Sequence, residues 1–474
     1  MQRFLCWDKK NFSENNGVAV VQHRPEMKNL ALTGDDPWEG VHNGYACVIK
    51  VGDAYRMYYR ADGQRGEVHK DESVRSKSLL CVAESKDGIA FTKPVIGKVE
   101  YNGSKENNAV FTRDNGKRMD TFTVFYDTNP NCPPEEKFKG LARDSGTTIL
   151  DFFISADGYD FTFVQEIKLN GSYDSYNTVF WDDVKRQYCL YYRGFHSPDG
   201  TVLAGMPPES ETANVRDIRL AVSKDFRNWD FVGLIEYEDG KDIQLYTNQI
   251  APYYRDKKTL IGFPSRYYDR VAEKENYYDM PIADLRCART DRGATALTDC
   301  VIMTSTDGLL FDRRSSAFLT PGPENSANWW YGDCYTAYGM VETVAEDGEN
   351  REISMYVGEN YRVKKVDFRR FTVRLDGFFS WYGDGDGAVA VTKPFVLEKE
   401  NMFVNFGTSA LGALKITLLD KGGAEIPGYE SNTLFGDSTN RPVRFSKSLR
   451  ELVGKEIMVK AELTDCHLYS FTFE

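Results

Sequence analysis

The 474-residue chain lacks any run of about 18 apolar residues, so we expect no transmembrane helix. Its first residues, MQRFLCWDKKNFSENN, place charged and amide side chains where a secretion signal needs an unbroken apolar stretch. We therefore expect a cytoplasmic protein that does not bind membranes. A secreted protein whose leader had been removed would begin in the same way. The sequence does not indicate an oligomeric state.

Motifs for metals, cofactors and activated nucleophiles are also missing. The nine cysteines are scattered singly, without a CxxC pair, and the five histidines show no ligand spacing, which disfavours disulfide frameworks and zinc sites. There is no GxxxxGK[ST], GxSxG or HExxH motif. The Gly-rich run at 383–387 is interpreted as a linker turn rather than a calcium loop. We predict no metal and no cofactor.

Basic charge is in deficit, and aromatic residues are in excess. The 59 Lys and Arg residues against 71 Asp and Glu residues give a net charge of −12, which disfavours a nucleic-acid partner. Aromatic residues make up 14% of the chain, which is typical both of sheet-rich folds and of sugar-binding clefts. Convincing long amphipathic helices are absent, so the chain is predicted to be all-β.

A repeated hairpin organises the first three quarters of the chain. A Ser-x-Asp motif follows a β-rich run and precedes an aromatic residue, which indicates a strand, a tight turn and a second strand. It occurs at residues 85–91, 155–161, 223–229 and 305–311. Two further strands precede the hairpin in each unit, and each of them recurs five times along the chain. The first strands are predicted at 43–50, 107–113, 176–182, 247–254 and 335–341, and the second strands at 55–60, 122–127, 188–194, 259–266 and 352–360.

Five consecutive four-stranded units predict a five-bladed β-propeller over residues 1–370, because such sheets bury both faces only when they pack radially. The fifth unit lacks the Ser-x-Asp hairpin, so we expect an N-terminal strand, residues 18–23, to close the ring. The repeat ends after residue 370. Residues 371–474 contain short alternating strands and are predicted to form an antiparallel β-sandwich.

The register of the blades selects candidate site residues. In an antiparallel blade, the start of the first strand and the end of the second lie on the same face. Residues just before the first strands are Glu39, Glu106, Asp174, Gln244 and Asp333, and residues ending the second strands are Arg60, Asp127, Arg193, Arg266 and Glu359. This pattern predicts a funnel mouth lined by carboxylates and arginines. The alternative is that these acids form turns and that the arginines only pair with them.

Paired carboxylates beside aromatic rings favour cleavage of glycosidic bonds, in which one carboxyl protonates the leaving oxygen while the other attacks or activates water. We predict Asp174 and Glu39 as the principal catalytic carboxylates and Glu359 as a third, with Asp333 and Glu106 in reserve. The predicted substrate-binding residues are Arg60, Asn107, Asn177, Arg193, Asn248, Arg266, Trp330 and Asp333.

The chain resembles the invertase/levanase family of glycoside hydrolases and, in its propeller, the arabinanase/β-xylosidase family. It resembles more closely a group of uncharacterised bacterial proteins described as similar to invertases. The motifs that carry the resemblance are DDPWEG (35–40), DSYN (174–177), RDIRLAVSKDF (216–226), LYTNQIAPY (245–253), GFPSR (262–266), RLDGFFS (374–380), TKPF (392–395), FGDS (435–438) and LYSFTF (468–473). The resemblance implies a five-bladed propeller followed by a sandwich, a site in the funnel, and a glycoside or oligosaccharide substrate.

The departures from the invertase pattern exclude a direct transfer of fructoside specificity. The segment 35–40 only approximates the family's Asn-Asp-Pro-Asn-Gly nucleophile motif, and the Arg-Asp-Pro and Glu-Cys motifs have no match. Two alternatives to a glycosidase therefore stay open. Arginines at the mouth would also suit the phosphate of a glycoside phosphorylase, and a propeller can bind carbohydrate without catalysis.

Overall fold

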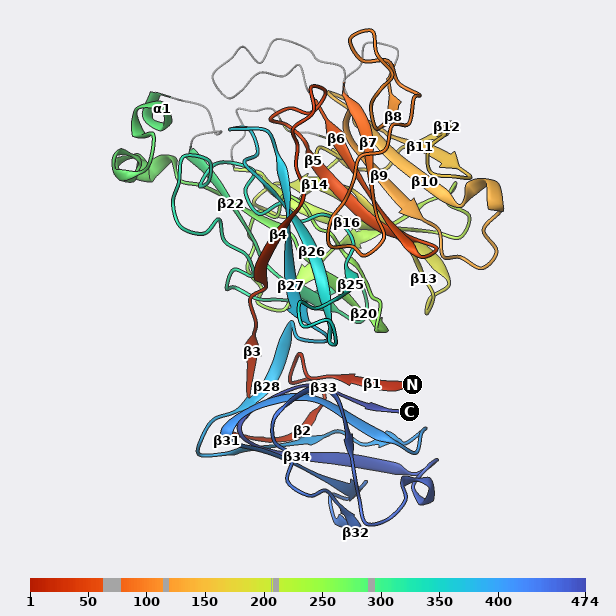
Figure 1. The fold of residues 1–474 in the computed structure, drawn as a ribbon, viewed down its shortest axis with the longest axis vertical. Helices are drawn as coiled ribbons and strands as arrows, with labels where there is room; N and C mark the ends of the chain where they lie inside the picture. Colours follow the sequence, from red (N-terminus) through yellow and green to blue (C-terminus); the bar gives the residue numbers. More distant parts are fainter. Residues whose placement is uncertain (63–77, 114–118, 206, 208–212, 289–294) are drawn as a thin grey trace. The chain divides into compact units, whose positions relative to one another are not determined.

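The computed structural model describes residues 1–62, 78–113, 119–205, 207, 213–288 and 295–474 (Figure 1). The chain divides into two compact units: residues 26–343 with 354–372, and residues 1–25 with 344–353 and 373–474. Helices among the described residues are short: η1 (Pro134–Glu136), η2 (Val271–Asp279), α1 (Ala283–Ala288) and η3 (Leu449–Glu451). None of them has the length and apolar character required to cross a membrane.

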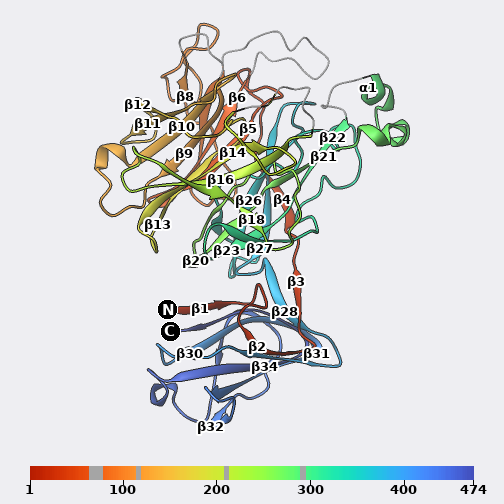
Figure 2. The same cartoon turned by 180° about the vertical axis from the view of Figure 1, so that it is seen from behind.

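Five sheets, antiparallel apart from one two-residue strand in blade four, form the blades of a β-propeller, as predicted (Figures 1 and 2). Blades one and two contain β5 (Gly44–Val51), β6 (Ala54–Ala61), β7 (Leu79–Ser85) and β8 (Ala109–Thr112), then β9 (Met119–Tyr126), β10 (Phe138–Asp144), β11 (Leu150–Ser155) and β12 (Thr162–Ile167). Blade three contains β13 (Thr178–Asp182), β14 (Gln187–His196), β16 (Val215–Ser223) and β17 (Asp230–Leu234), with β15 (Val202–Leu203) paired to β14.

Blade four contains β19 (Ala251–Tyr253), β20 (Asp256–Gly262), β23 (Met303–Ser305) and β24 (Leu310–Arg313), and β18 (Glu236–Tyr237) runs parallel to β24. A separate hairpin of β21 (Ser265–Asp269) and β22 (Ala296–Cys300) is inserted into this blade. Blade five contains β25 (Val341–Val344), β26 (Arg351–Glu359), β27 (Asp367–Arg374) and β4 (Glu26–Leu32).

An N-terminal strand closes the ring, but it is not the predicted one. The strand β4 pairs with β27 and supplies the outer strand of blade five. The predicted segment, residues 18–23, instead contains β3 (Ala19–Gln22), which pairs with β28 (Phe379–Gly383) of the C-terminal unit. Alternation alone could not separate the two segments, because both offer a short strand of suitable length.

In blade two, each predicted strand corresponds to the strand before the one that was expected. The predicted first strand, at 107–113, contains β8, which pairs with β7 and belongs to blade one. The predicted second strand, at 122–127, overlaps β9, which is the inner strand because it contacts β5 and β13 of the neighbouring blades. The true second strand is β10, which pairs with β9 and β11. The prediction was wrong here because β9 has the aromatic alternation of a second strand.

The four Ser-x-Asp motifs form the same tight turn. In the first, the N–H of Gly88 donates to Ser85 Oγ at 2.9 Å, and Asp87 Oδ1 accepts from the N–H of Ile89 at 2.8 Å. The residue after the aspartate takes a positive φ, which glycine adopts without steric cost. The third motif has Phe226 at this position, with a φ of 63°. Its backbone N–H still donates to Ser223 Oγ at 2.9 Å.

These turns receive hydrogen bonds from tyrosines of the preceding blade. The hydroxyl of Tyr58 in blade one donates to the carbonyl of Gly158 at 3.0 Å, and that of Tyr191 in blade three donates to Gly308 at 2.8 Å. Tyr356 of blade five bonds in the same way to Gly88 of blade one, at 2.5 Å. We call these contacts the tyrosine latches. Between blades two and three, Phe226 replaces the glycine, and its ring packs on Phe125 and Phe152.

The C-terminal unit is one antiparallel sheet of ten strands, all within described residues. It comprises β1 (Gln2–Leu5), β2 (Phe12–Asn16), β3, β28, β29 (Ala388–Thr392), β30 (Phe395–Val396), β31 (Met402–Asp420), β32 (Glu425–Glu430), β33 (Asp437–Val443) and β34 (Glu456–Phe473). Alternate residues of the long strands β31 and β34 are buried in a single core. Residues 1–25, which were predicted to belong to the propeller, thus supply three strands of this sheet.

The tyrosine latches lead to a stability prediction. Tyr191→Phe removes a buried donor and leaves the carbonyl of Gly308 without its partner, so the free energy of unfolding should fall by about 1–3 kcal/mol. Urea denaturation followed by fluorescence would measure the change. The matched control is Tyr268→Phe, because Tyr268 is 57% exposed and should tolerate the loss of its hydroxyl. Equal stabilities of the two variants would contradict the latch.

Candidate functional site

Three buried arginines lie where the second strands of blades one, two and three end. They are Arg60 on β6, Arg143 on β10 and Arg193 on β14, and each is at most 3% exposed. Gly44 and Thr121, near the starts of the first strands, pair with Arg60 and Arg143, so the start of a first strand and the end of a second strand lie together in these blades. The same end of each of the three blades therefore presents a guanidinium group.

Backbone carbonyls hold these guanidinium groups in place. Arg60 Nη2 donates to the carbonyl of His42 at 2.6 Å, and its Nη1 donates to that of Asp120 at 2.6 Å. Arg143 Nε donates to the carbonyl of Thr147 at 3.1 Å. Such neutral acceptors orient a guanidinium group without neutralising its charge, so the positive charge stays available for a carboxylate or a ligand.

Two partly exposed carboxylates lie between the arginines. Asp120 forms an ion pair with Arg143, and the side chain of Asp120 is 19% exposed. Asp174, with a 24% exposed side chain, lies 3.9 Å from Arg143 Nη1 and 3.8 Å from Arg193 Nη2. Both carboxylates thus approach the same nitrogen of Arg143. We call Arg60, Asp120, Arg143, Asp174 and Arg193 the charged arc.

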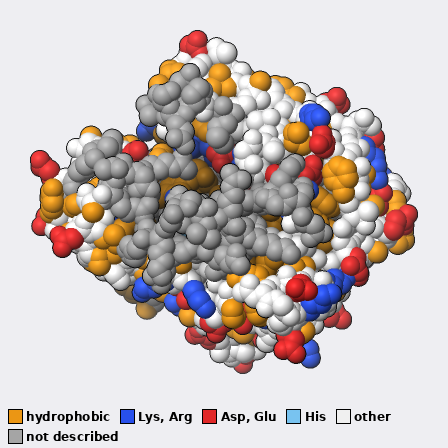
Figure 3. All heavy atoms as spheres, turned by 90° about the horizontal axis from the view of Figure 1, so that it is seen from above, with side chains coloured by type: hydrophobic (Ala, Val, Ile, Leu, Met, Phe, Trp, Pro, Cys, Tyr) orange, Lys and Arg blue, Asp and Glu red, His pale blue; other side chains and the backbone are white. Residues whose placement is uncertain are grey.

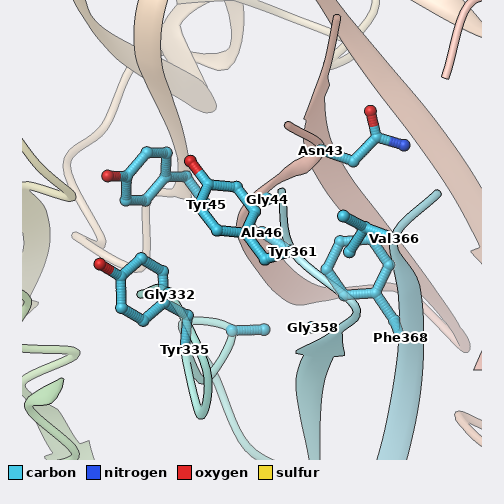
Figure 4. A pocket seen from close by; sticks show the side chains of 11 residues that line it. Asn43, Gly44, Tyr45, Ala46, Gly332, Tyr335, Gly358, Tyr361, Val366 and Phe368 are labelled. Atoms are coloured by element: carbon cyan, nitrogen blue, oxygen red, sulfur yellow. The ribbon is translucent and has the colours of Figure 1, made fainter. Parts of the chain in front are cut away.

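Tyrosine rings lie beside the charged arc. The guanidinium of Arg60 lies 5.2 Å from the ring centre of Tyr45, and that of Arg193 lies 4.8 Å from Tyr246. The rings of Tyr45 and Tyr335 are 6.1 Å apart, and those of Tyr335 and Tyr361 are 5.8 Å apart. These three tyrosines line a pocket with room for about one water molecule. Figure 4 shows their hydroxyl groups pointing toward the same side.

Two of the predicted catalytic carboxylates lie in other ion pairs. Glu39 is buried, with Lys93 Nζ 2.6 Å from its Oε2 and the hydroxyl of Tyr59 donating to Oε1 at 2.5 Å. Burial raises the pKa of the Glu39 carboxyl, while Lys93 opposes the shift. Glu359 accepts a hydrogen bond from Arg369 Nε at 2.6 Å. Of the three predicted catalytic residues, only Asp174 lies in the charged arc.

The predicted amide ligands support the backbone instead. Asn107 Nδ2 donates to the carbonyl of Val99 at 2.8 Å, and Asn177 Nδ2 donates to that of Ser175 at 2.8 Å. Asn248 Oδ1 accepts from the hydroxyl of Thr178 at 2.6 Å. All three amides are buried. All three amides are therefore engaged by other protein groups.

Arg266 and Trp330 are likewise engaged. Arg266 forms a two-pronged ion pair with Asp299, at 2.9 and 2.5 Å. Trp330 is buried, and the guanidinium of Arg286 lies 4.2 Å from its ring centre. The indole therefore does not present an open face to a sugar in this structure. Of the predicted substrate-binding residues, Arg60 and Arg193 are those that the fold brings together with Asp174.

Asp333 is a buried acid with an unusual pKa. Burial raises the pKa of its carboxyl to about 7, although the backbone N–H groups of Trp330 and Trp329 and the charge of Arg286 oppose the shift. The N–H of Trp330 donates to Asp333 Oδ2 at 3.0 Å. The segment around it is tightly turned, since Trp329 and Cys334 both have a φ of 59°. Asp333 therefore anchors a strained loop.

Sequence reasoning missed Arg143 and Asp120. Both lie in blade two, where 122–127 was mistaken for the second strand. The segment FKGLARD (138–144) aligns with YRMYYRA (55–61), and Arg143 then has the same position in its repeat as Arg60 has in the first. That match is the signal that could have found it. Asp127, predicted at the mouth, instead forms a buried ion pair with Lys139 at 2.6 Å.

No protein-family model matches the chain, and no curated protein matches it in sequence. Similar solved structures include an N-acetylgalactosamine deacetylase from F. plautii in complex with blood group B trisaccharide, with 12% identity, a TM-score of 0.46, and coverage of 74% of this chain and 95% of its own. A glycosyl hydrolase from Bacteroides ovatus has 13% identity, a TM-score of 0.42, and coverage of 74% and 94%. An endo-arabinase from Bacteroides thetaiotaomicron has 8% identity, a TM-score of 0.38, and coverage of 73% and 97%.

The raised pKa of Asp333 predicts a pH-dependent stability. An unfolded aspartate loses its proton near pH 4, whereas the folded carboxyl keeps it until about pH 7, so ionisation destabilises the fold as the pH rises through this window. Asp333→Asn does not titrate there. The free energy of unfolding of the wild type, measured relative to Asp333→Asn, should therefore fall between about pH 4.5 and 7.5 in urea titrations. A constant difference would show that Asp333 titrates normally.

Proposed function

We propose that the chain is a glycoside hydrolase in which Asp174 and Asp120 are the reacting carboxylates. Hydrolysis of a glycosidic bond needs two carboxyl groups at the bond, one to protonate the leaving oxygen and one to attack the sugar or activate water. Asp174 and Asp120 are the two partly exposed carboxylates that share Arg143. Glu39 keeps a structural role in this proposal, because Lys93 and Tyr59 occupy its oxygens.

The proposal rests on the oxygens of Asp174, which are not saturated with hydrogen-bond donors. Within the described residues its carboxylate accepts no hydrogen bond, and its two neighbouring guanidinium groups remain 3.8 and 3.9 Å away. A carboxylate fixed for structure alone is normally saturated with donors, as Glu39 is. Asp174 therefore has oxygen lone pairs that can meet a substrate or a water molecule, and the arginines limit its movement by charge.

The surroundings suit a sugar. Arg60 and Arg193 can donate hydrogen bonds to ring and hydroxyl oxygens, and the tyrosine rings offer apolar faces with polar tips. Around the visible rim of one molecular face, acidic and basic side chains are scattered among hydrophobic ones (Figure 3). A hydroxyl-rich substrate that needs both donors and acceptors fits this mixture better than a polyanion does.

A panel assay tests the reaction class. Sugar release from oligosaccharides and aryl glycosides, measured with and without phosphate, separates hydrolysis from phosphorolysis. Release that needs no phosphate supports the hydrolase. Release only with phosphate would make the enzyme a glycoside phosphorylase that uses the arginines of the charged arc. Binding of the same sugars without release would indicate a carbohydrate-binding propeller.

Substitutions test the two carboxylates. Asp174→Asn and Asp120→Asn should each lower kcat by about 10²–10⁴-fold, because the amide cannot transfer a proton or attack the sugar. The circular dichroism spectrum should not change. The control is Asp160→Asn, since the Asp160 side chain is 75% exposed and lies on a hairpin turn of blade two. If Asp174→Asn retained wild-type turnover while the control behaved as expected, Asp174 would have no part in the reaction.

A further inference from the structure

A second cavity, of about 390 Å³, lies in the propeller unit outside the charged arc. It is bounded by His196 at the end of β14, by residues 216–218 of β16, and by the segments 234–237 and 240–243. The small pocket between Tyr45, Tyr335 and Tyr361 holds about one water molecule, whereas this cavity has room for a whole sugar unit. All of its lining residues are described.

The polar groups of this cavity are held in place before any ligand binds. His196 Nδ1 lies 3.2 Å from Asp217 Oδ2, and His196 Nε2 lies 2.9 Å from Asp242 Oδ2. The hydrogen bond to Asp217, together with Asp242, raises the pKa of His196 to about 9, so the ring carries a proton on both nitrogens at neutral pH. Asp217 in turn accepts from Arg219 Nε at 2.8 Å. Both oxygens of Asp217 are thus occupied by Arg219 and His196, and the 54% exposed Asp242 is the carboxylate of this group that can accept from a ligand.

The cavity is connected to the charged arc through one aromatic residue. Arg216, which lines the cavity, lies 5.9 Å from the ring centre of Tyr246. The guanidinium of Arg193 lies 4.8 Å from the same ring. Arg193 Nη2 is in turn 3.8 Å from Asp174. Tyr246 and Arg193 are buried, so a sugar chain that reaches from Asp174 to the cavity passes over these packed side chains.

We propose that this cavity binds a second sugar unit of the substrate, and that the unit is uncharged and rich in hydroxyl groups. The inference rests on the proposed function, because it places the substrate's reacting bond at Asp174. Isoleucine side chains provide apolar walls for the C–H face of a sugar, and the charged lining is balanced in sign. The charged lining consists of Asp217, Glu236, Asp242, His196, Arg216 and Lys241.

Filling the cavity tests the proposal. Ile243→Trp places a bulky ring in it, and Val184→Trp is the control, since Val184 is 57% exposed in the turn between β13 and β14. With the active sugar found by the panel, Ile243→Trp should lower kcat/KM at least tenfold for the trisaccharide and less than twofold for the p-nitrophenyl monoglycoside. Equal losses on both substrates, or no loss on either, would overturn the proposal.

A binding measurement separates this inference from the proposed function. Saturation-transfer NMR with arabinotriose, xylotriose and galactotriose requires no turnover. We expect Asp174→Asn to bind at least one of these probes and the double variant Asp174→Asn/Ile243→Trp to lose that binding. Asp242→Ala should weaken it several-fold, and this variant is safe for folding because the Asp242 side chain is 54% exposed. Binding that survives both cavity substitutions, or no binding of any probe, would overturn the second sugar site whether or not the chain hydrolyses glycosides.

Discussion

The tyrosine latch is the interaction that holds the ring of blades together at the junctions of blades one and two, three and four, and five and one. A four-stranded sheet cannot bury both of its faces alone, so each blade needs its neighbour in a fixed position. The hydroxyl of Tyr58, Tyr191 or Tyr356 supplies that position by reaching the carbonyl of a turn in the next blade. The turn exposes this carbonyl because its central residue has a positive φ. Where Phe226 replaces glycine, ring packing replaces the hydrogen bond at the turn, and blades two and three are joined by other polar contacts, such as the hydroxyl of Tyr188 donating to Asp127 at 2.8 Å.

In blades one and three, the latches also determine the direction of an arginine of the charged arc. On β6, Arg60 follows Tyr58 by two residues, and on β14 Arg193 follows Tyr191 by the same interval. Side chains two residues apart on a strand lie on the same face, so fixing the tyrosine in a neighbouring blade also fixes the direction of the arginine. The blade-to-blade contact and the candidate site are thus parts of the same strand. A one-residue shift in the register of β6 or β14 would turn its tyrosine and its arginine to the other face of the sheet. The guanidinium group would then no longer lie at the mouth of the funnel.

The sequence predicts the repeat and the number of blades because the turns have a strict chemistry: serine, aspartate and a positive φ. It does not reveal which strand of a blade an aromatic run belongs to, since β9 and β14 both alternate large apolar residues. That ambiguity hid Arg143. It also does not distinguish a carboxylate that is free to react from one that is saturated. Glu39 and Asp174 occupy equivalent places before a first strand, but Lys93 and the hydroxyl of Tyr59 occupy the oxygens of Glu39, whereas Asp174 lies 3.8 Å from Arg193.

The position of β4 has a consequence for the order in which the protein can be completed during synthesis. Arg369 on β27 donates to the carbonyl of Lys28 on β4, 341 residues earlier in the chain. At about 5–20 residues per second, a ribosome needs about 17–70 s after making β4 to reach its partner β27. During that time β4 is an unpaired edge, open to pairing with other nascent chains. Its sequence, EMKNLAL, places Glu26 and Lys28 in its first half, and charges of this kind discourage such pairing.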